Sequence, residues 1–129
     1  MGTEDGGDAF EKVKASTTKK LIGTHSDTFH CDEVLATTML LYTDAYKDSL
    51  IVRTRQENIF DKLDIVCDVG AIYDPAKQRY DHHQKTFKDT WKNEEGDKTK
   101  LSSAGLIYKH FGKEVISNAV QQIWGIELD

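Results

Sequence analysis

The sequence predicts an α/β fold in which a mostly parallel sheet is flanked by helices. Two apolar runs, residues 49–53 and 63–69, are nearly continuous rather than alternating, which is typical of parallel strands covered on both faces. An amphipathic segment lies between a first short apolar run and these two, and short links join the segments. A chain of 129 residues fits one domain. We therefore expect one domain over residues 19–129, preceded by a flexible tail over residues 1–18.

The first elements follow from the apolar pattern. Residues 19–24 are apolar in the middle and polar afterwards, which predicts a buried first strand. From Asp32 onward, large apolar residues recur at steps of four, three and four, at Leu35, Met39, Tyr42 and Tyr46. This spacing predicts a helix that extends to Tyr46. Asp32 and Glu33 stand at its start, where free amides and the helix dipole favour carboxylates, so capping alone would explain that pair.

The second half of the chain predicts a turn, a short strand and two helices. Residues 70–75 form the turn, because the only proline of the chain restricts the residue before it to extended geometry. Residues 78–80 return as a short strand, and residues 84–100 form a polar loop. Ser102 or Ser103 caps a helix that runs through Phe111 and ends at Gly112. A last helix spans residues 115–124, with Gly125 as its terminating glycine.

The composition limits which classes of protein and which cellular compartments fit this sequence. The net charge of −5 is not typical of binding by phosphate neutralisation alone, although bound divalent cations would offset several of the carboxylates. Two cysteines, Cys31 and Cys67, make no disulfide framework, and each is explained most simply as a small buried residue. No apolar run is long enough for a membrane span, and the acidic start is unlike a signal peptide. We expect an intracellular protein, with mitochondrion, nucleus and cytoplasm left open.

Candidate metal ligands follow three of the predicted strands. Residues 24–33 hold two histidines and three carboxylates, Asp68 ends the third strand, and residues 81–83 read Asp-His-His. Imidazole and carboxylate together suit zinc, manganese and iron. Each residue alone has a simpler explanation, such as a surface histidine or an aspartate that accepts turn amides. Their joint placement at strand ends leads to the hypothesis that the three segments close around one metal cluster.

Basic residues near these segments are candidates for phosphate contacts. They are Arg53, Arg55, Lys77, Arg79, Lys85 and Lys88. A solvated charged face explains any one of them more simply. Arg53 and Arg55 are the strongest candidates because they follow a predicted strand directly.

Six motifs in order carry a resemblance to a known family. They are IGTHSDTFHCDE (22–33), VRTR (52–55), DIVCDVG (64–70), YDP (73–75), RYDHHQ (79–84) and LSSAGL (101–106). Together they resemble the MYG family, named after a melanocyte proliferating gene, which is a eukaryotic branch of the DHH phosphoesterase superfamily. The resemblance runs from about residue 21 to residue 111.

This resemblance implies a manganese-dependent phosphoesterase, and in the MYG branch a 3′-to-5′ exonuclease that acts on RNA or oligonucleotides. It implies one ion held by His25, His30 and Asp68, and a second held by Asp32, Asp68 and His82, so that Asp68 bridges two Mn²⁺, with Mg²⁺ or Zn²⁺ as alternatives. His83 would then face the scissile phosphate as an electrostatic stabiliser or proton donor, with Asp68 as the other catalytic residue. Arg53, Arg55 and Arg79 would bind substrate. Asp81 would orient an imidazole by a hydrogen bond and would not bind the metal itself.

The sequence departs from the family pattern in two ways. Asp27 stands where the family usually has glycine, which places an extra carboxylate beside the first metal. DHH proteins also have a further aspartate ligand and a second domain downstream, and we expect this chain to be a partial DHH-type domain that lacks both. An apolar surface left uncovered by the missing part would favour self-association.

Two alternatives to the exonuclease stay open. The chain is a metal-binding or partner-binding module that is catalytically incomplete, or it is a mononuclear zinc hydrolase. In the second case His25 or His30, together with Asp32 and His82, would hold a single ion with one open position.

Overall fold

The fold is an α/β arrangement built on one mostly parallel sheet. We describe residues 6–129 of a computed structural model of the chain. The strands are β1 (Leu21–Thr24), β2 (Leu50–Arg53), β3 (Ile65–Cys67), β4 (Tyr73–Asp74) and β5 (Arg79–Tyr80). Their order across the sheet is β2-β1-β3-β5-β4, with every neighbouring pair parallel except the antiparallel pair β4 and β5. The predicted fold class is therefore confirmed.

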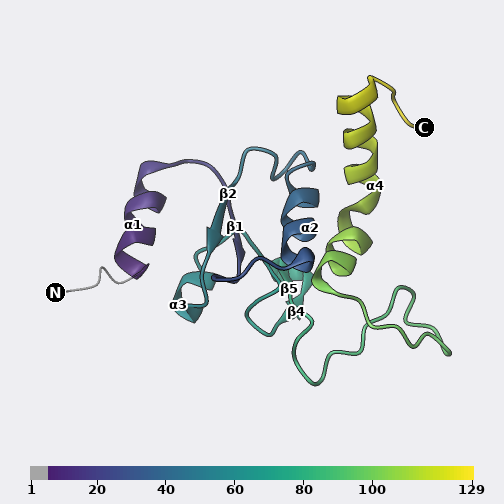
Figure 1. Ribbon diagram of the computed structural model, residues 1–129, viewed down its shortest axis with the longest axis horizontal. Coiled ribbons are helices and arrows are strands. Elements are labelled where there is room, and N and C mark those ends of the chain that lie inside the picture. The colour runs from purple at the N-terminus through teal and green to yellow at the C-terminus, as the bar shows by residue number, and fades with distance from the viewer. Residues whose placement is uncertain (1–5) are drawn as a thin grey trace.

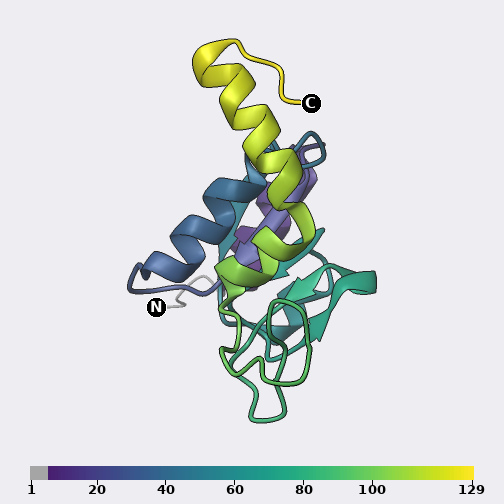
Figure 2. The ribbon, with the colours of Figure 1, turned by 90° about the vertical axis from the view of Figure 1, so that its right-hand side faces the viewer.

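Helices cover both faces of this sheet (Figure 1). The helices are α1 (Gly6–Ser16), α2 (Cys31–Leu40), α3 (Glu57–Phe60) and α4 (Ser103–Trp124), and a 3-10 turn, η1 (Pro75–Lys77), follows β4. Helices α2 and α4 lie on one side of the sheet, and α1 and α3 lie on the other. Figure 2 faces the first side and shows α2 and α4 next to each other. The result is a three-layer domain.

Successive side chains of β1 and β3 point into different cores. Ile22 and Ile65 are buried with residues of α2 and α4, whereas Leu21 and Val66 are buried with residues of α1 and α3. This alternation is the two-residue period of an extended strand whose two faces are both covered. The prediction of two covered faces is wrong for β2, which lies at the edge of the sheet and leaves Ile51 42% exposed.

The expected flexible tail is instead helical over most of its length. Residues 1–5 lie outside the described part of the chain, and α1 begins at Gly6. Its Phe10 is buried in the same core as Leu21 and Ile59, and Glu11 forms an ion pair with Lys62. The prediction missed α1 because the polar composition of this segment hides one anchoring aromatic side chain. It also missed the short elements α3 and β4, the latter inside the expected turn over residues 70–75.

Helix α2 ends at Leu40, six residues earlier than the apolar spacing predicts. The Thr43 hydroxyl donates to the carbonyl oxygen of Leu40 at 2.7 Å, which satisfies one of the free carbonyls at the helix end. The amides of Tyr42 and Thr43 donate three residues back, to Met39 and Leu40, and tighten the chain into a turn. Tyr46 is still buried, so it fits the apolar spacing because it packs in the core, although it is not part of the helix.

The two helices expected at the end of the chain are one continuous helix, α4. Ser102 is its N-cap, since the Ser102 hydroxyl accepts from the Gly105 amide at 3.1 Å. Gly112 does not end it, because no proline follows and the residues beyond it favour helix. A Cβ at Gly112 would lie 2.8 Å from the Tyr108 ring, so this glycine serves close packing. Gly125, at φ 67°, ends the helix as expected.

None of the helices within residues 6–129 combines the length and the apolar character needed to cross a lipid bilayer.

Candidate metal centre

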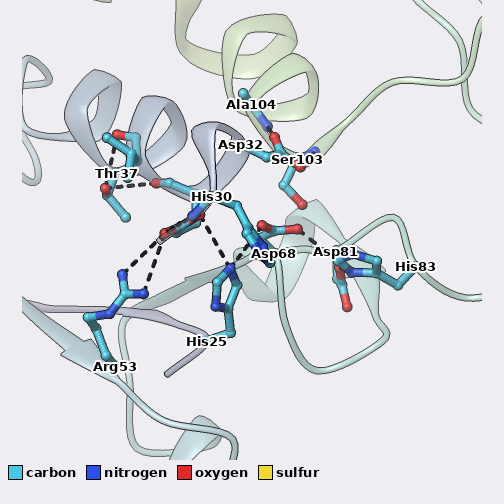
Figure 3. A network of polar contacts seen from close by, with 12 residues as sticks. His25, His30, Asp32, Thr37, Arg53, Asp68, Asp81, His83, Ser103 and Ala104 are labelled. Atoms are coloured by element: carbon cyan, nitrogen blue, oxygen red, sulfur yellow. Dashed lines mark hydrogen bonds and ion pairs between the residues drawn. The ribbon is translucent and has the colours of Figure 1, made fainter. Parts of the chain in front are cut away.

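Three segments meet at the carboxyl edge of the sheet. His25 follows β1, Asp68 follows β3, and residues 81–83 follow β5, while the first turn of α2 adds Asp32 and Glu33. The strands β1, β3 and β5 are parallel neighbours, so their carboxyl ends lie side by side. Figure 3 shows the resulting network of imidazoles and carboxylates.

Asp68, which the prediction assigns to both ligand sets, contacts a histidine of each. Its Oδ2 is 3.5 Å from His25 Nε2, and its Oδ1 is 3.3 Å from His82 Nε2. His82 Nε2 is also 3.0 Å from Asp32 Oδ2. The backbone of Asp68 has φ 60°, a left-handed conformation that residues other than glycine adopt at some cost and that recurs at functional sites. The predicted bridging residue thus contacts both histidines.

The donor atoms fit a divalent cation. His25 Nδ1 is 3.0 Å from the carbonyl oxygen of Ser26, which only accepts, so Nδ1 carries the proton. The Nε2 lone pair of a neutral His25 then faces the carboxylates of Asp68 and, at 3.3 Å, Glu33. His25 Nε2, His82 Nε2 and Asp68 Oδ1 are all buried with no hydrogen-bond partner among residues 6–129. A cation between these atoms would satisfy the lone pairs and offset the buried negative charge.

His30 belongs to the same half of the centre as His25. The centroids of the two imidazole rings are 5.0 Å apart. One ligand atom each from His25, His30 and Glu33 lies within 4.8 Å of the others. A second such group contains Asp68, Asp81, His82 and His83.

Glu33 is a member of the centre that the sequence interpretation assigned only to capping. Its side chain is fully buried, and both carboxylate oxygens accept from the His30 amide at 2.8 Å. Burial acts to raise the pKa of Glu33, but these amide bonds and the charges of His25 and Arg53 outweigh it and hold the pKa below its ordinary value. The signal for its burial is its helical spacing from Ala36 and Leu40, which share the inner face of α2.

Asp32 is held by the start of α4. Its carboxylate accepts from the amide of Ala104 at 2.6 Å and from that of Ser103 at 3.2 Å. These amides are free because the first turn of a helix has no internal acceptors for them. Asp32 Oδ2 still lies 3.0 Å from His82 Nε2. Figure 3 shows Asp32 beside Ser103 and Ala104, so α4 fixes the direction of this carboxylate.

Asp81 contacts His83, as expected for a residue that orients an imidazole. Asp81 Oδ1 is 2.6 Å from His83 Nδ1 and accepts from the His82 amide, while Oδ2 accepts from the Ala71 amide at 2.7 Å. Asp81 is buried, whereas the His83 side chain is 60% exposed. Because Nδ1 is engaged by Asp81, Nε2 is the His83 nitrogen left for a bound molecule.

Burial and a neighbouring carboxylate together raise the pKa of Asp68. Burial is the larger cause and the charge of Asp32 is the next, while the three nearby histidines act in the opposite direction. A divalent cation bound beside Asp68 would favour its charged form, and so would oppose the effects of burial and of Asp32 on its pKa.

Two of the three predicted substrate-binding arginines lie near the metal centre, and the third does not. Arg53 lies within 3.4 Å of Glu33, and Arg55 lines the same pocket as His25, His30 and Asp68. Arg79 is turned away, because its guanidinium donates to backbone carbonyls that include those of Phe60 and Leu63, and we no longer expect it to bind substrate.

Asp27 does not reach the centre. Its side chain is 82% exposed and lies 3.7 Å from Arg55 Nε, which corrects the expectation of an extra carboxylate beside the first metal. The three candidate lysines, at 77, 85 and 88, are exposed. Cys31 is exposed rather than buried, whereas Cys67 is buried, which raises the pKa of its thiol. Neither cysteine belongs to the two ligand groups found among residues 6–129.

The fold and this site define an α/β protein with a histidine and carboxylate centre suited to a divalent cation. The chain belongs to the MYG1 family, described as Uncharacterised protein family (UPF0160), whose model matches residues 21–126. This finding confirms the MYG resemblance, whereas membership of the DHH superfamily stays a prediction.

Curated relatives cover most of this chain with high identity. A MYG1 protein of Caenorhabditis elegans is 54% identical over 99 residues, which are 75% of this chain and 29% of that protein. The human MYG1 exonuclease is 52% identical over 99 residues, 74% of this chain and 26% of that protein. A MYG1 protein of Schizosaccharomyces pombe is 50% identical over 102 residues, 79% of this chain and 31% of that protein. This chain thus spans roughly a quarter to a third of the length of these relatives. No solved structure matches it.

Proposed function

We propose that this chain forms the metal-binding part of a phosphodiesterase that acts as an exonuclease on RNA. The observation that carries the proposal is the position of Asp68 between His25 and His82, with unpartnered nitrogens of both histidines directed toward it. The relatives from human and cattle that are named MYG1 exonuclease support the nuclease class. The 3′-to-5′ direction, the preference for RNA and the DHH relationship rest on the motif resemblance.

Two ions, most simply Mn²⁺, would occupy the centre. His25, His30 and Asp68 would hold one, and Asp32, Asp68 and His82 would hold the other. When bound, such a pair activates a water molecule and stabilises charge on the attacking and leaving oxygens of a phosphodiester. The Glu33 carboxylate would add negative charge beside the first ion, since it faces the same His25 nitrogen at 3.3 Å.

The remaining residues would position the substrate. Asp81 keeps the Nδ1 proton of His83 in place, so His83 Nε2 would face the scissile phosphate and, when protonated, donate to it. Arg55, which lines the pocket, would contact a neighbouring phosphate. We place the protein inside the cell and leave the compartment open.

The test is degradation of an end-labelled single-stranded RNA by this chain with Mn²⁺. We expect loss of label that disappears with chelator and slows about a hundredfold in the His82→Ala variant, because that change removes one predicted ligand. His110→Ala is the matched control, since His110 lies outside the centre and bonds to the Tyr73 hydroxyl. Degradation that persists in chelator or in His82→Ala would refute the proposal.

A metal-binding module without turnover is the second candidate. It is supported by the same two groups of possible ligands, which would bind a cation whether or not turnover follows. It predicts bound metal and no loss of label in the same assay, and a relative of full length would then degrade the RNA while this chain does not.

A further inference from the structure

Phe29 is an apolar ring held in the open beside the metal centre. It immediately precedes His30, in the turn between β1 and α2. Its side chain is 70% exposed, more than that of any other large apolar residue within the described range 6–129. A ring in such a place contributes little to the core.

Arg53 fixes the orientation of this ring. The guanidinium carbon of Arg53 lies over the Phe29 ring, 4.1 Å from its centroid, within the range of cation–π contacts. Both terminal nitrogens of the same guanidinium donate to Glu33 Oε1 at 3.4 Å, and Figure 3 shows Arg53 directed toward the turn that carries His30. Since Glu33 is fully buried, the arrangement from Glu33 through Arg53 to Phe29 is anchored in the core.

The surroundings of Phe29 favour a flat polar ligand over an apolar protein segment. Asp27, Thr28 and Arg55 are exposed nearby in the same turn or at the end of β2, so the ring is a single apolar surface among charged and polar groups. A protein partner that binds through apolar contacts needs a larger patch. A nucleobase needs one aromatic face, and a positive charge close by for its phosphate.

We propose that Phe29, backed by Arg53, is a stacking platform for a nucleobase of single-stranded nucleic acid whose phosphate lies at the metal centre. This inference rests on the proposed function, which supplies the class of ligand. It adds a base contact to a site otherwise made of phosphate and metal contacts. Stacking of this kind tolerates all four bases, so the platform would provide affinity and register without sequence preference.

The test compares two labelled hexamers by fluorescence anisotropy in Mn²⁺. One is a phosphorothioate RNA, and the other is the same backbone without bases, so that charge is equal. We expect the chain to bind the base-bearing hexamer about tenfold more tightly than the abasic one. Phe29→Leu should abolish that ratio and leave abasic binding unchanged, whereas Phe29→Tyr should keep the ratio. Circular dichroism establishes that each variant is folded.

Trp124→Leu is the matched control for loss of an exposed aromatic ring. Trp124 is 67% exposed, close to the value for Phe29, and lies at the far end of α4, about 30 Å along the helix from the residues that bind Asp32. It should keep the tenfold ratio. An equal ratio in wild type and Phe29→Leu, or no binding of either hexamer, would overturn the inference.

Hydrolysis of bis(p-nitrophenyl) phosphate, measured in parallel, separates this inference from the proposed function because that ester carries no base. Metal-dependent hydrolysis with a ratio unchanged in Phe29→Leu would reject the platform alone. A ratio that depends on Phe29 without any hydrolysis would support the platform and reject the phosphodiesterase.

Discussion

Asp68 contacts one histidine from each of the two predicted ligand sets. Its two carboxylate oxygens face different histidines, His25 and His82. We therefore expect Asp68→Ala to remove tightly bound Mn²⁺ from both positions, as counted by elemental analysis after gel filtration. Asp61→Ala, an exposed aspartate after α3, serves as the control and should keep both ions. Two tightly bound ions in Asp68→Ala would be incompatible with the bridging role.

Asp27 adopts a backbone conformation that suits glycine. Its φ of 70° lies in the left-handed region, which glycine adopts without the steric cost that a side chain brings. We expect Asp27→Gly to be at least as stable as wild type and Asp27→Val to lose about 1–2 kcal/mol, because β-branched residues fit this region poorly. Urea unfolding measures both changes. Thr28→Val, at the neighbouring exposed position, should have little effect, and equal stability of the two valine variants would contradict the strain argument.

Individual site residues could be predicted where they follow parallel strands. The meeting of His25, Asp68 and His82 follows from strand order alone, since the carboxyl ends of adjacent parallel strands share an edge. Glu33 could not be predicted as a member of the centre, because a carboxylate at the start of a helix is already explained by capping. Its burial depends on how α2 packs on the sheet. The prediction that Arg79 binds substrate was wrong, because its guanidinium donates to backbone carbonyls near α3. The sequence around Arg79 does not reveal these partners.

At the scale of elements, the start of α4 and the start of α2 stabilise each other through Asp32. In chelator, Asp32→Ala should be less stable than Asp32→Asn by about 1 kcal/mol, because only the asparagine keeps an acceptor for the amides of Ser103 and Ala104. Both variants remove the charge, so their difference isolates the hydrogen bonds. Equal unfolding midpoints for the two would show that these bonds do not support the packing of α4.

Element types were easier to predict than element ends. Strands β1, β2 and β3 appear as expected because apolar runs of that length identify strands between polar links. The predicted end of α2 was wrong because the apolar spacing continues into a turn beyond the helix, where Tyr46 is still buried. The break at Gly112 was wrong because glycine serves close packing as well as termination. Helix α1 depends on the burial of Phe10, a tertiary contact that composition does not reveal.

At the scale of the whole molecule, the far part of α4 carries an apolar surface. Figure 1 shows the end of this helix projecting beyond the three layers. The exposed apolar side chains are Ile116, Ile123 and Trp124 on α4, and Ile126 and Leu128 in the residues that follow it. An apolar patch of this kind favours association. Self-association of the chain is therefore a prediction that gel filtration over a hundredfold concentration range tests.

Charged side chains introduced on this surface should prevent the predicted self-association. The double variant Ile123→Lys and Trp124→Lys should elute as a monomer at concentrations where wild type elutes earlier. Val13→Lys, an exposed apolar position on α1, is the control and should behave as wild type. A wild-type elution volume that is constant over the whole range would contradict the prediction.

The most direct test of the account is the position of bound manganese. Crystals grown with Mn²⁺ and measured at the manganese absorption edge should show two anomalous peaks on opposite sides of the Asp68 carboxylate, about 3.5–4 Å apart. One peak should lie next to His25 and His30, and the other next to Asp32 and His82. A single peak, or peaks that contact neither His25 nor His82, would contradict the central claim that these segments close around a pair of ions.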